Sequence, residues 1–302
     1  MTTIHLALDW TPNINHIGFL IAKELGLYEQ QGIELSIINP AEDNYQVTPG
    51  KKLELDHADF AIAPFETVIS LNNKTNKVDA VAVFAILQND LSSIVTLEKS
   101  GIVSPKDLDG KVYASYKARY EDHIVKQMIV NAGGTGSIEI SYPEKLGIWN
   151  TLLEGNAAST WIFDNWEGVE AESKNVALNK FKMGDYGIPY GYSPVVLAKQ
   201  SNIAKNKELY GKFINLTKEG FLYAQSNPKA SVDILEKYAG QYQDIDLAKT
   251  LEVTAQHFGD KETCGIMQAE RVSSFIKWIV DNGLENEGIL KQTLFTNALV
   301  RP

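Results

Sequence analysis

The sequence predicts an α/β protein made of two lobes with a ligand cleft between them. Short segments with the apolar alternation of buried strands are repeatedly followed by segments with the apolar spacing of helices. A second series of such segments lies between two stretches rich in turn-forming residues, 88–92 and 184–194. We therefore expect a discontinuous first lobe, residues 1–88 with 190–302, and an inserted second lobe, residues 89–189. Two crossings of this kind can act as a hinge.

The first lobe is expected to begin with a strand, a helix and a second strand. Alternating apolar residues through Leu8 form one buried face, and apolar residues then recur at helical spacing over Ile17–Tyr28, up to a stop at Gly32. The run 78–87 is apolar throughout, as in a central strand of a parallel sheet that is buried on both faces. The strands expected before the insertion are 4–8, 34–38, 57–63 and 78–87.

The second lobe is expected to repeat this alternation. Ser104 and Pro105 open a short helix as N-cap and first-turn residue, and Gly133 ends a helix that runs through 124–129. The other elements expected here are strands at 93–96, 112–114, 138–141 and 160–163 and a helix at 146–153. The elements expected after the return crossing are a strand at 195–198 and helices over 209–224, 230–238 and 272–280.

Composition and charge favour a small organic ligand over other partners. The 302 residues suffice for two domains of ordinary size. The formal net charge of −10 disfavours nucleic acid and anionic membrane surfaces, because both attract basic proteins. No apolar run reaches the ~18 residues that a membrane span needs. The single cysteine, Cys264, allows no intramolecular disulfide and is expected to be an ordinary core or helix-surface thiol.

The first ten residues, MTTIHLALDW, lack the basic, apolar and cleavage regions of a secretory signal. We therefore expect a cytoplasmic protein as the sequence is written. If a leader has been removed, the protein is expected to be periplasmic or lipid-anchored.

Polar and aromatic residues follow several of the predicted strands. These corners are Asp9-Trp10-Thr11-Pro12-Asn13-Ile14-Asn15-His16 after the first strand, Phe65-Glu66 after the third, and Asp164-Asn165-Trp166-Glu167 in the second lobe. Loops at the carboxyl ends of strands hold the ligand in α/β sheets, so we expect these corners to face the cleft. The alternative is that Asp9 and Asn15 cap the next helix while Trp10 packs in the core.

With these corners, the chain resembles the sulfonate-binding and thiamine-pyrimidine family, which has a type II periplasmic-binding-protein fold. The resemblance covers roughly residues 4–200. The segments that carry it are LDWTPNINHIGFLIAKELGLYEQQGIEL, DFAIAPFETVIS, SGIVSPKDLDGKVYASYKARYED, LGIWNTLLEGNAASTWIF and DYGIPYGYSPVVLA.

The resemblance implies two contrasting functions. Formylaminopyrimidine-binding proteins capture a thiamine-derived pyrimidine for uptake, with an ABC-transporter permease as partner. Thiamine pyrimidine synthase makes the pyrimidine phosphate from pyridoxal phosphate and one of its own histidines, with iron. Ala63 and Thr67 stand where the synthase has its cofactor lysine and substrate histidine, and its cysteine-rich run is missing. The resemblance therefore favours a binding protein without cofactor, with the synthase, or a binding protein for another heterocycle or a sulfonate, as alternatives.

A substituted aminopyrimidine is flat and rimmed with donors and acceptors, so it calls for aromatic faces and a carboxylate. The candidate faces are Trp10, Tyr116, Trp161, Trp166, Tyr190 and Tyr192. The candidate carboxylates are Glu66 and Glu167, with solvated acids at helix starts as the alternative. The candidate rim residues are Asn13, His16, Ser115 and Ser193, and Asp9 and Asp164 are further candidate ligand-binding residues. Arg119 is placed either to hold an anionic group or to form a salt bridge with Glu121 or Asp122.

The sequence contains no familiar catalytic or metal-binding pattern. We find no phosphate-binding loop, no nucleophile elbow and no histidine spacing typical of a metal site. Ligand binding without catalysis is therefore the expected function.

Overall fold

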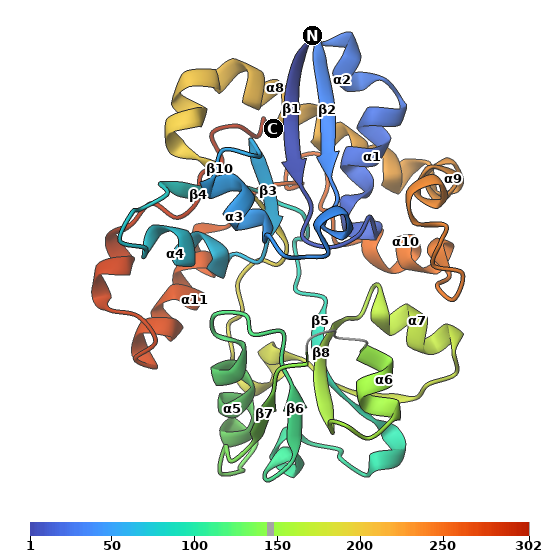
Figure 1. The fold of residues 1–302 in the computed structure, drawn as a ribbon, viewed down its shortest axis with the longest axis vertical. Coiled ribbons are helices and arrows are strands. Elements are labelled where there is room, and N and C mark those ends of the chain that lie inside the picture. Colours follow the sequence, from blue (N-terminus) through green and yellow to red (C-terminus); the bar gives the residue numbers. More distant parts are fainter. Residues whose placement is uncertain (144–147, 302) are drawn as a thin grey trace.

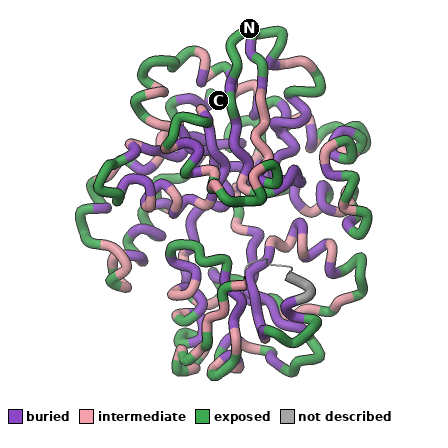
Figure 2. The backbone as a smooth tube through the Cα atoms, viewed as in Figure 1, coloured by how far each residue is buried: buried purple, intermediate pink, exposed green. Residues whose placement is uncertain are grey.

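The computed structural model describes residues 1–143 and 148–301 and arranges them as two lobes, one above the other in Figure 1. Each lobe is built around a five-stranded mixed sheet with helices packed against it. The predicted two-lobed α/β architecture is confirmed. Figure 2 shows buried residues concentrated along the strands of both sheets and exposed residues on the outer loops.

The first sheet has the strand order β2-β1-β3-β10-β4. These strands are Ile33–Ile38, Thr2–Ala7, Phe60–Ala63, Val195–Lys199 and Ala80–Ala85. β1 pairs in parallel with β2 and β3, whereas β10 runs antiparallel between β3 and β4. In Figure 1 the carboxyl ends of β1, β2 and β3 all point toward the second lobe. The loops that follow them therefore lie where the two lobes meet.

The position of β4 differs from the prediction for the apolar run 78–87. All six residues of β4 are buried, as expected, but the strand lies at the end of the sheet and pairs antiparallel with β10. The C-terminal part of the chain covers its outer edge through bridges from Ala82 to Phe295 and from Ala85 to Gly265. Complete burial therefore results from a distant segment rather than from a central, parallel position.

The second sheet has the strand order β7-β6-β8-β5-β9. These strands are Glu139–Ser141, Val112–Ala114, Ser159–Phe163, Ser92–Leu97 and Leu178–Phe181. β6 pairs in parallel with β7 and β8, and β5 runs antiparallel between β8 and β9. In each sheet the fourth strand is thus the first strand after a crossing between the lobes. β9 was not predicted, since only one of its four residues is fully buried.

The helices of the first lobe cover both faces of its sheet. They are α1 Ile17–Glu24, α2 Leu27–Gln30, α3 Pro49–Glu54, α4 Glu66–Asn72, α8 Gln200–Ser226, α9 Pro228–Ala239, α10 Leu247–Ala255 and α11 Ala269–Asp281. The helices of the second lobe are α5 Glu121–Asn131, α6 Ile148–Leu153 and α7 Glu167–Ser173. Short 3₁₀ helices are η1 Ile14–His16, η2 Pro40–Asp43, η3 Glu98–Ser100, η4 Pro105–Leu108, η5 Met183–Tyr186 and η6 Glu287–Lys291.

Two predicted helices have different bounds in the structure. The helix expected over Ile17–Tyr28 is divided into α1 and α2 at Gly26, whose φ of +68° is incompatible with a continuous helix. The helix expected at 146–153 is observed as α6, and its first two predicted residues lie outside the described ranges. Cys264 is buried, in a turn rather than on a helix surface. Within residues 1–143 and 148–301, no helix is both long and apolar enough to cross a membrane.

Candidate functional site

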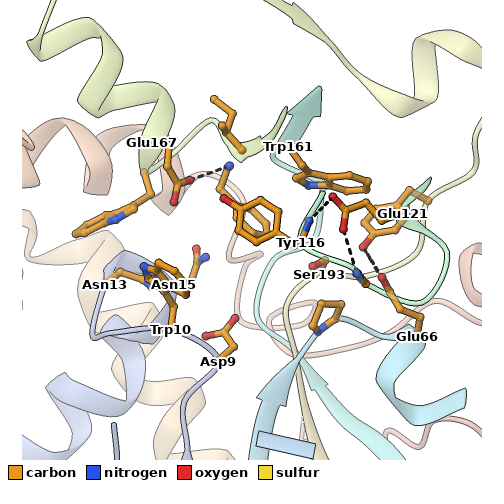
Figure 3. Close-up of a pocket in the computed structure, with 16 residues that line it drawn as sticks. Asp9, Trp10, Asn13, Asn15, Glu66, Tyr116, Glu121, Trp161, Glu167 and Ser193 are labelled. Carbon is orange, nitrogen blue, oxygen red and sulfur yellow. Dashed lines mark hydrogen bonds between the residues drawn. The ribbon is translucent and has the colours of Figure 1, made fainter. Parts of the chain in front are cut away.

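A cavity of about 220 Å³ lies between the two lobes and is lined from both of them (Figure 3). The first-lobe side consists of Asp9, Trp10, Asn13, Asn15, Pro64 and Glu66. The second-lobe side consists of Tyr116, Ala118, Glu121, Trp161, Ile162, Phe163, Trp166 and Glu167. The return crossing adds Tyr190 and Ser193. Most of the residues proposed from the sequence are therefore brought together around this one cavity.

The corner after β1 is held by its own side chains. The Asn13 side chain accepts from the backbone N–H of Asn15 at 2.9 Å and caps η1. The backbone N–H of Asn13 donates to His16 Nδ1 at 3.2 Å, which leaves the ring proton on Nε2 to donate to Asp9 Oδ1 at 2.8 Å. His16 is completely buried behind the cavity wall. It therefore orients Asp9 instead of lining the cavity.

The walls of the cavity are aromatic. Trp10 is 36% exposed and Tyr116 is 37% exposed, whereas Trp161, Trp166 and Tyr190 are buried. The alternative that Trp10 is a core residue is therefore wrong. Trp161 packs edge-on against Tyr190, with ring centroids 5.3 Å apart. Rings fixed in this way offer preformed faces to a flat ligand.

Two carboxyl groups enter the cavity from the first residues of helices. Glu66 at the start of α4 is buried, and its Oε1 accepts from the Tyr190 hydroxyl at 3.1 Å. Glu167 at the start of α7 is half-buried, and its Oε2 accepts from the backbone N–H of Phe163 at 2.9 Å. Burial raises the pKa of Glu66 to about 7 and that of Glu167 to about 7. Neither group is the solvated helix-terminal acid considered as the alternative.

Glu121 was missed as a cavity residue and had been considered only as an ion-pair partner of Arg119. Its Oε1 accepts from the Tyr113 hydroxyl at 2.6 Å and from the Tyr116 N–H at 2.9 Å, and its Oε2 accepts from the Ala118 N–H at 3.0 Å. The carboxylate thus shapes the loop that presents Tyr116. Glu121 follows the loop at the end of β6, as Glu66 follows the end of β3. This position in the sequence could have identified Glu121 as a cavity residue.

The other lining residues that sequence reasoning left out lack such a signal. They are Asn15, Pro64, Ala118, Ile162 and Phe163. Asn15 belongs to the corner expected to face the cleft but is not among the candidate ligand-binding residues, and the rest are apolar residues whose orientation depends on the tertiary structure.

Three further candidates lie outside the lining because other groups engage them. The Ser115 hydroxyl donates to Asp122 Oδ1 at 2.6 Å. The Asp164 carboxylate accepts from the Ser93 hydroxyl at 2.9 Å and lies 3.3 Å from the Lys180 ammonium. The Tyr192 hydroxyl accepts a backbone N–H 2.9 Å away, and its ring is covered by the Arg271 guanidinium 4.1 Å from the centroid.

Arg119 also lies outside the lining, and its partner differs from the two that were predicted. Its Nε donates to Glu285 Oε1 at 2.9 Å, and the Tyr120 hydroxyl donates to the same oxygen at 2.8 Å. Glu285 Oε2 accepts from the Asn73 amide at 2.6 Å. This ion pair joins the second lobe to the C-terminal part of the first, so Arg119 bridges the lobes. The predicted salt bridge to Glu121 or Asp122 is wrong.

The chain is similar to a binding protein and to an enzyme that are each named for a pyrimidine. It is 22% identical over 240 residues to the formylaminopyrimidine-binding protein of Halalkalibacterium halodurans, a match that covers 78% of this chain and 70% of that protein. It is 23% identical over 239 residues to the 4-amino-5-hydroxymethyl-2-methylpyrimidine phosphate synthase of Legionella pneumophila, covering 77% of this chain and 72% of that one.

The fold is shared with a solved binding protein. The periplasmic aliphatic sulphonate-binding protein SsuA of Escherichia coli matches over the full length of both chains, with a TM-score of 0.71 and 16% sequence identity. This likeness confirms the type II periplasmic-binding-protein fold. The model of the family described as NMT1/THI5 like matches residues 13–231, which is more than half of the chain. The chain therefore belongs to the NMT1/THI5 like family.

Proposed function

We propose that this protein is a solute-binding protein that closes around a small thiamine-related pyrimidine and releases it unchanged. The observation that carries the proposal is the combination of aromatic walls with the carboxyl groups of Glu66 and Glu167, both with a raised pKa, in one cavity between the lobes. In Figure 3 these two groups lie at opposite ends of the cavity, with the Tyr116 ring between them.

The size of the cavity supports a ligand with a single ring. Its volume of about 220 Å³ is below the ~300–1,000 Å³ that is usual for drug-sized ligands. A six-membered heteroaromatic ring with short substituents is of a size that suits this volume, and Trp10 and Tyr116 are the exposed rings of the lining. A carboxyl group whose pKa is near 7 can accept from an amino group or share a proton with a ring nitrogen. Glu66 and Glu167 supply two such positions.

In this proposal the lobes are residues 1–88 with 190–302 and residues 89–189, and the two crossings form the hinge. A binding protein of this kind would deliver its ligand to the permease of an ABC transporter. Delivery requires that the lobes open again, which would break interlobe contacts such as those of Asn165 and Arg119.

The synthase alternative finds no support in the residues around the cavity. Ala63 is buried within β3, and Thr67 lies against Gly50, where an added Cβ would be 2.8 Å from Thr67 Cγ2. Among the described residues that line the cavity there is neither lysine nor histidine. Across residues 1–143 and 148–301, no three His, Cys, Asp or Glu side chains are grouped to hold a metal ion. The residues present therefore do not fit pyridoxal phosphate on a lysine, or iron.

The test is a titration with 4-amino-5-hydroxymethyl-2-methylpyrimidine, followed by tryptophan fluorescence and calorimetry. Wild-type protein should bind with a change in fluorescence. Trp10→Ala should weaken binding by roughly 1–3 kcal/mol, because a buried stacking surface is lost. Trp10→Phe keeps an aromatic face and should retain most of the affinity. Wild-type affinity in Trp10→Ala would remove Trp10 from the site, and absence of binding to the wild type would reject the proposed ligand.

A second measurement separates binding from synthesis. Pyridoxal phosphate added to the protein should produce no stoichiometric aldimine absorbance, and aerobic incubation with iron should leave all five histidines intact by mass spectrometry. One equivalent of pyrimidine phosphate per chain with loss of a histidine would establish the synthase instead.

A further inference from the structure

The charged side chains that line the cavity are acidic. Asp9, Glu66, Glu121 and Glu167 all line it, and none of the described lining residues is lysine, arginine or histidine. Glu121 is committed to the protein, because its two oxygens accept three hydrogen bonds, and Asp9 accepts one hydrogen bond from the buried His16. The Glu66 carboxyl group accepts from one hydroxyl, that of Tyr190, which lies 3.1 Å from Oε1 and 3.4 Å from Oε2, and the Glu167 carboxyl group accepts from the Phe163 N–H at Oε2. They therefore keep acceptor positions for a ligand.

Three cationic side chains of the second lobe have partners outside the cavity lining. The Lys117 ammonium lies over the Tyr142 ring, 5.3 Å from its centroid. Arg119 is paired with Glu285. Lys180 lies 3.3 Å from Asp164 Oδ1. Each of these side chains would have to leave its partner to reach an anion in the cavity.

The cationic groups behind the first-lobe wall are also committed. Arg271 donates to the carbonyl oxygens of Gln88 and Gly191, one on each crossing, and its guanidinium covers Tyr192. The His16 ring accepts from the Asn13 N–H on one nitrogen and donates to Asp9 from the other, so it has no donor left for a ligand. An anion in the cavity would therefore meet carboxylates without a counter-ion.

We propose that the cavity selects the unphosphorylated pyrimidine and rejects its phosphate ester, with Glu66 and Glu167 as the residues that determine this specificity. The inference rests on the proposed function and narrows it. A phosphate ester brings close to two negative charges, and burying them beside carboxylates that have no cationic partner opposes binding. A hydroxymethyl or aminomethyl group instead offers the carboxylates hydrogen-bond donors. The raised pKa values of both glutamates show that the cavity already disfavours negative charge on its own groups.

The experiment compares three pyrimidines that differ only at the 5-substituent. Calorimetry at pH 7.5 would use 4-amino-2-methylpyrimidine bearing 5-hydroxymethyl, 5-aminomethyl or 5-phosphooxymethyl. We expect the phosphate ester to bind about 100-fold more weakly than the alcohol, or worse, and the aminomethyl compound at least as tightly as the alcohol. The double variant Glu66→Gln with Glu167→Gln should reduce the ratio of the affinity for the alcohol to that for the phosphate ester by about tenfold. The reason is that removal of two carboxylate charges weakens their repulsion of the phosphate group. Glu172→Gln, an exposed acid on α7 outside the lining, is the matched control and should leave the ratio unchanged.

The outcomes separate this inference from the function on which it rests. If the alcohol and the phosphate ester bind with similar affinity, the charge selectivity is rejected while the pyrimidine-binding function stands. If none of the three compounds binds, the proposed function fails and the inference fails with it. If the ester is excluded but the double variant keeps the wild-type ratio, Glu66 and Glu167 do not determine the specificity.

Discussion

At the scale of single residues, Glu66 shows how a short polar corner becomes a site. Pro64 ends β3, and Glu66 begins α4 with its carboxyl group in a buried position beside Tyr190. Loss of hydration is the largest cause of its raised pKa, and the charges of Glu121 and Asp90 add to it. The Glu66 carboxyl group, which can accept a hydrogen bond from a ligand, therefore destabilises the ligand-free protein when it ionises.

This coupling predicts a pH-dependent stability that belongs to Glu66. The pKa rises from 4.5 to about 7 on folding, so the folded protein holds the proton more tightly. The associated stabilisation is complete below about pH 4.5 and is lost as the pH rises through about 7, for a total of about 3 kcal/mol. Glu66→Gln should therefore unfold with a free energy that falls less than that of the wild type between pH 5 and pH 8. Urea denaturation at both pH values measures the difference.

Glu172→Gln serves as the control in the same experiment. Its exposed carboxylate is not part of the cavity, so the variant should keep the pH dependence of the wild type. Parallel behaviour of Glu66→Gln and the wild type would mean that Glu66 titrates as an ordinary carboxylate.

At the scale of elements, the close approach of α1 and α8 holds the corner after β1 in place. A Cβ built on Gly220 of α8 would lie 2.0 Å from the carbonyl oxygen of Gly18 on α1. A Cβ on Gly18 would lie 2.2 Å from the Phe221 ring. Only glycine permits this contact, and α1 begins directly after η1, which carries Asn15 and His16. Packing of the two helices is therefore linked to the position of the cavity wall.

Gly220→Ala should lower the free energy of unfolding by about 1–3 kcal/mol, because the added methyl group forces the helices apart. Gly211→Ala is the matched control on the same helix, where a Cβ would meet nothing within 4 Å. It should raise the free energy of unfolding by about 0.5–1 kcal/mol, since alanine loses less backbone entropy than glycine. Thermal or urea denaturation of both variants decides the matter, and equal stability of the two would show that α1 and α8 are separated in solution.

At the scale of the whole molecule, polar contacts between the lobes flank the cavity on two sides. On one side the buried Asn165 amide donates to Asn15 Oδ1 at 2.9 Å and to Thr254 Oγ1 at 3.1 Å. On the other side Arg119 pairs with Glu285. Trp166 of the second lobe also packs edge-on against Tyr242 of the first, with centroids 5.7 Å apart. The structure thus represents a closed arrangement of the lobes.

Closure should depend on ligand, because a ligand that contacts both walls stabilises the closed state more than the open one. Small-angle scattering should show a smaller radius of gyration at saturating pyrimidine than in the empty protein. Asn165→Ala removes the interlobe hydrogen bonds to Asn15 and Thr254 without replacing a lining residue, and it should weaken affinity by about 1–2 kcal/mol without altering which pyrimidine is preferred. Identical scattering curves with and without ligand would indicate a rigid cleft or a ligand held by one lobe.

Several features of the site could be predicted from short stretches of sequence. Asp9, Trp10 and Asn13 follow a strand that is recognisable from its alternating apolar residues alone. Glu66 and Glu167 follow strands that are recognisable from the residues around them. Residues within a few positions of a strand end lie near that end. The residues at the carboxyl edge of the sheet could therefore be predicted from the sequence. The sequence places His16 at this corner as a candidate rim residue, but its side chain lies behind the cavity wall. Its contacts with Asp9 and Asn13 depend on the geometry of η1, which the sequence pattern does not show.

The sequence by itself predicted most of the strands and helices, although not β9, and it placed polar corners directly after β1, β3 and β8, because each of these features depends on residues close together in the chain. The tertiary structure decided the edge position of β4, the pairing of Arg119 with Glu285 and the burial of Tyr192 under Arg271. These contacts join residues far apart in sequence. Local periodicity carries no information on such partners, since only the packing of the whole chain brings them within reach.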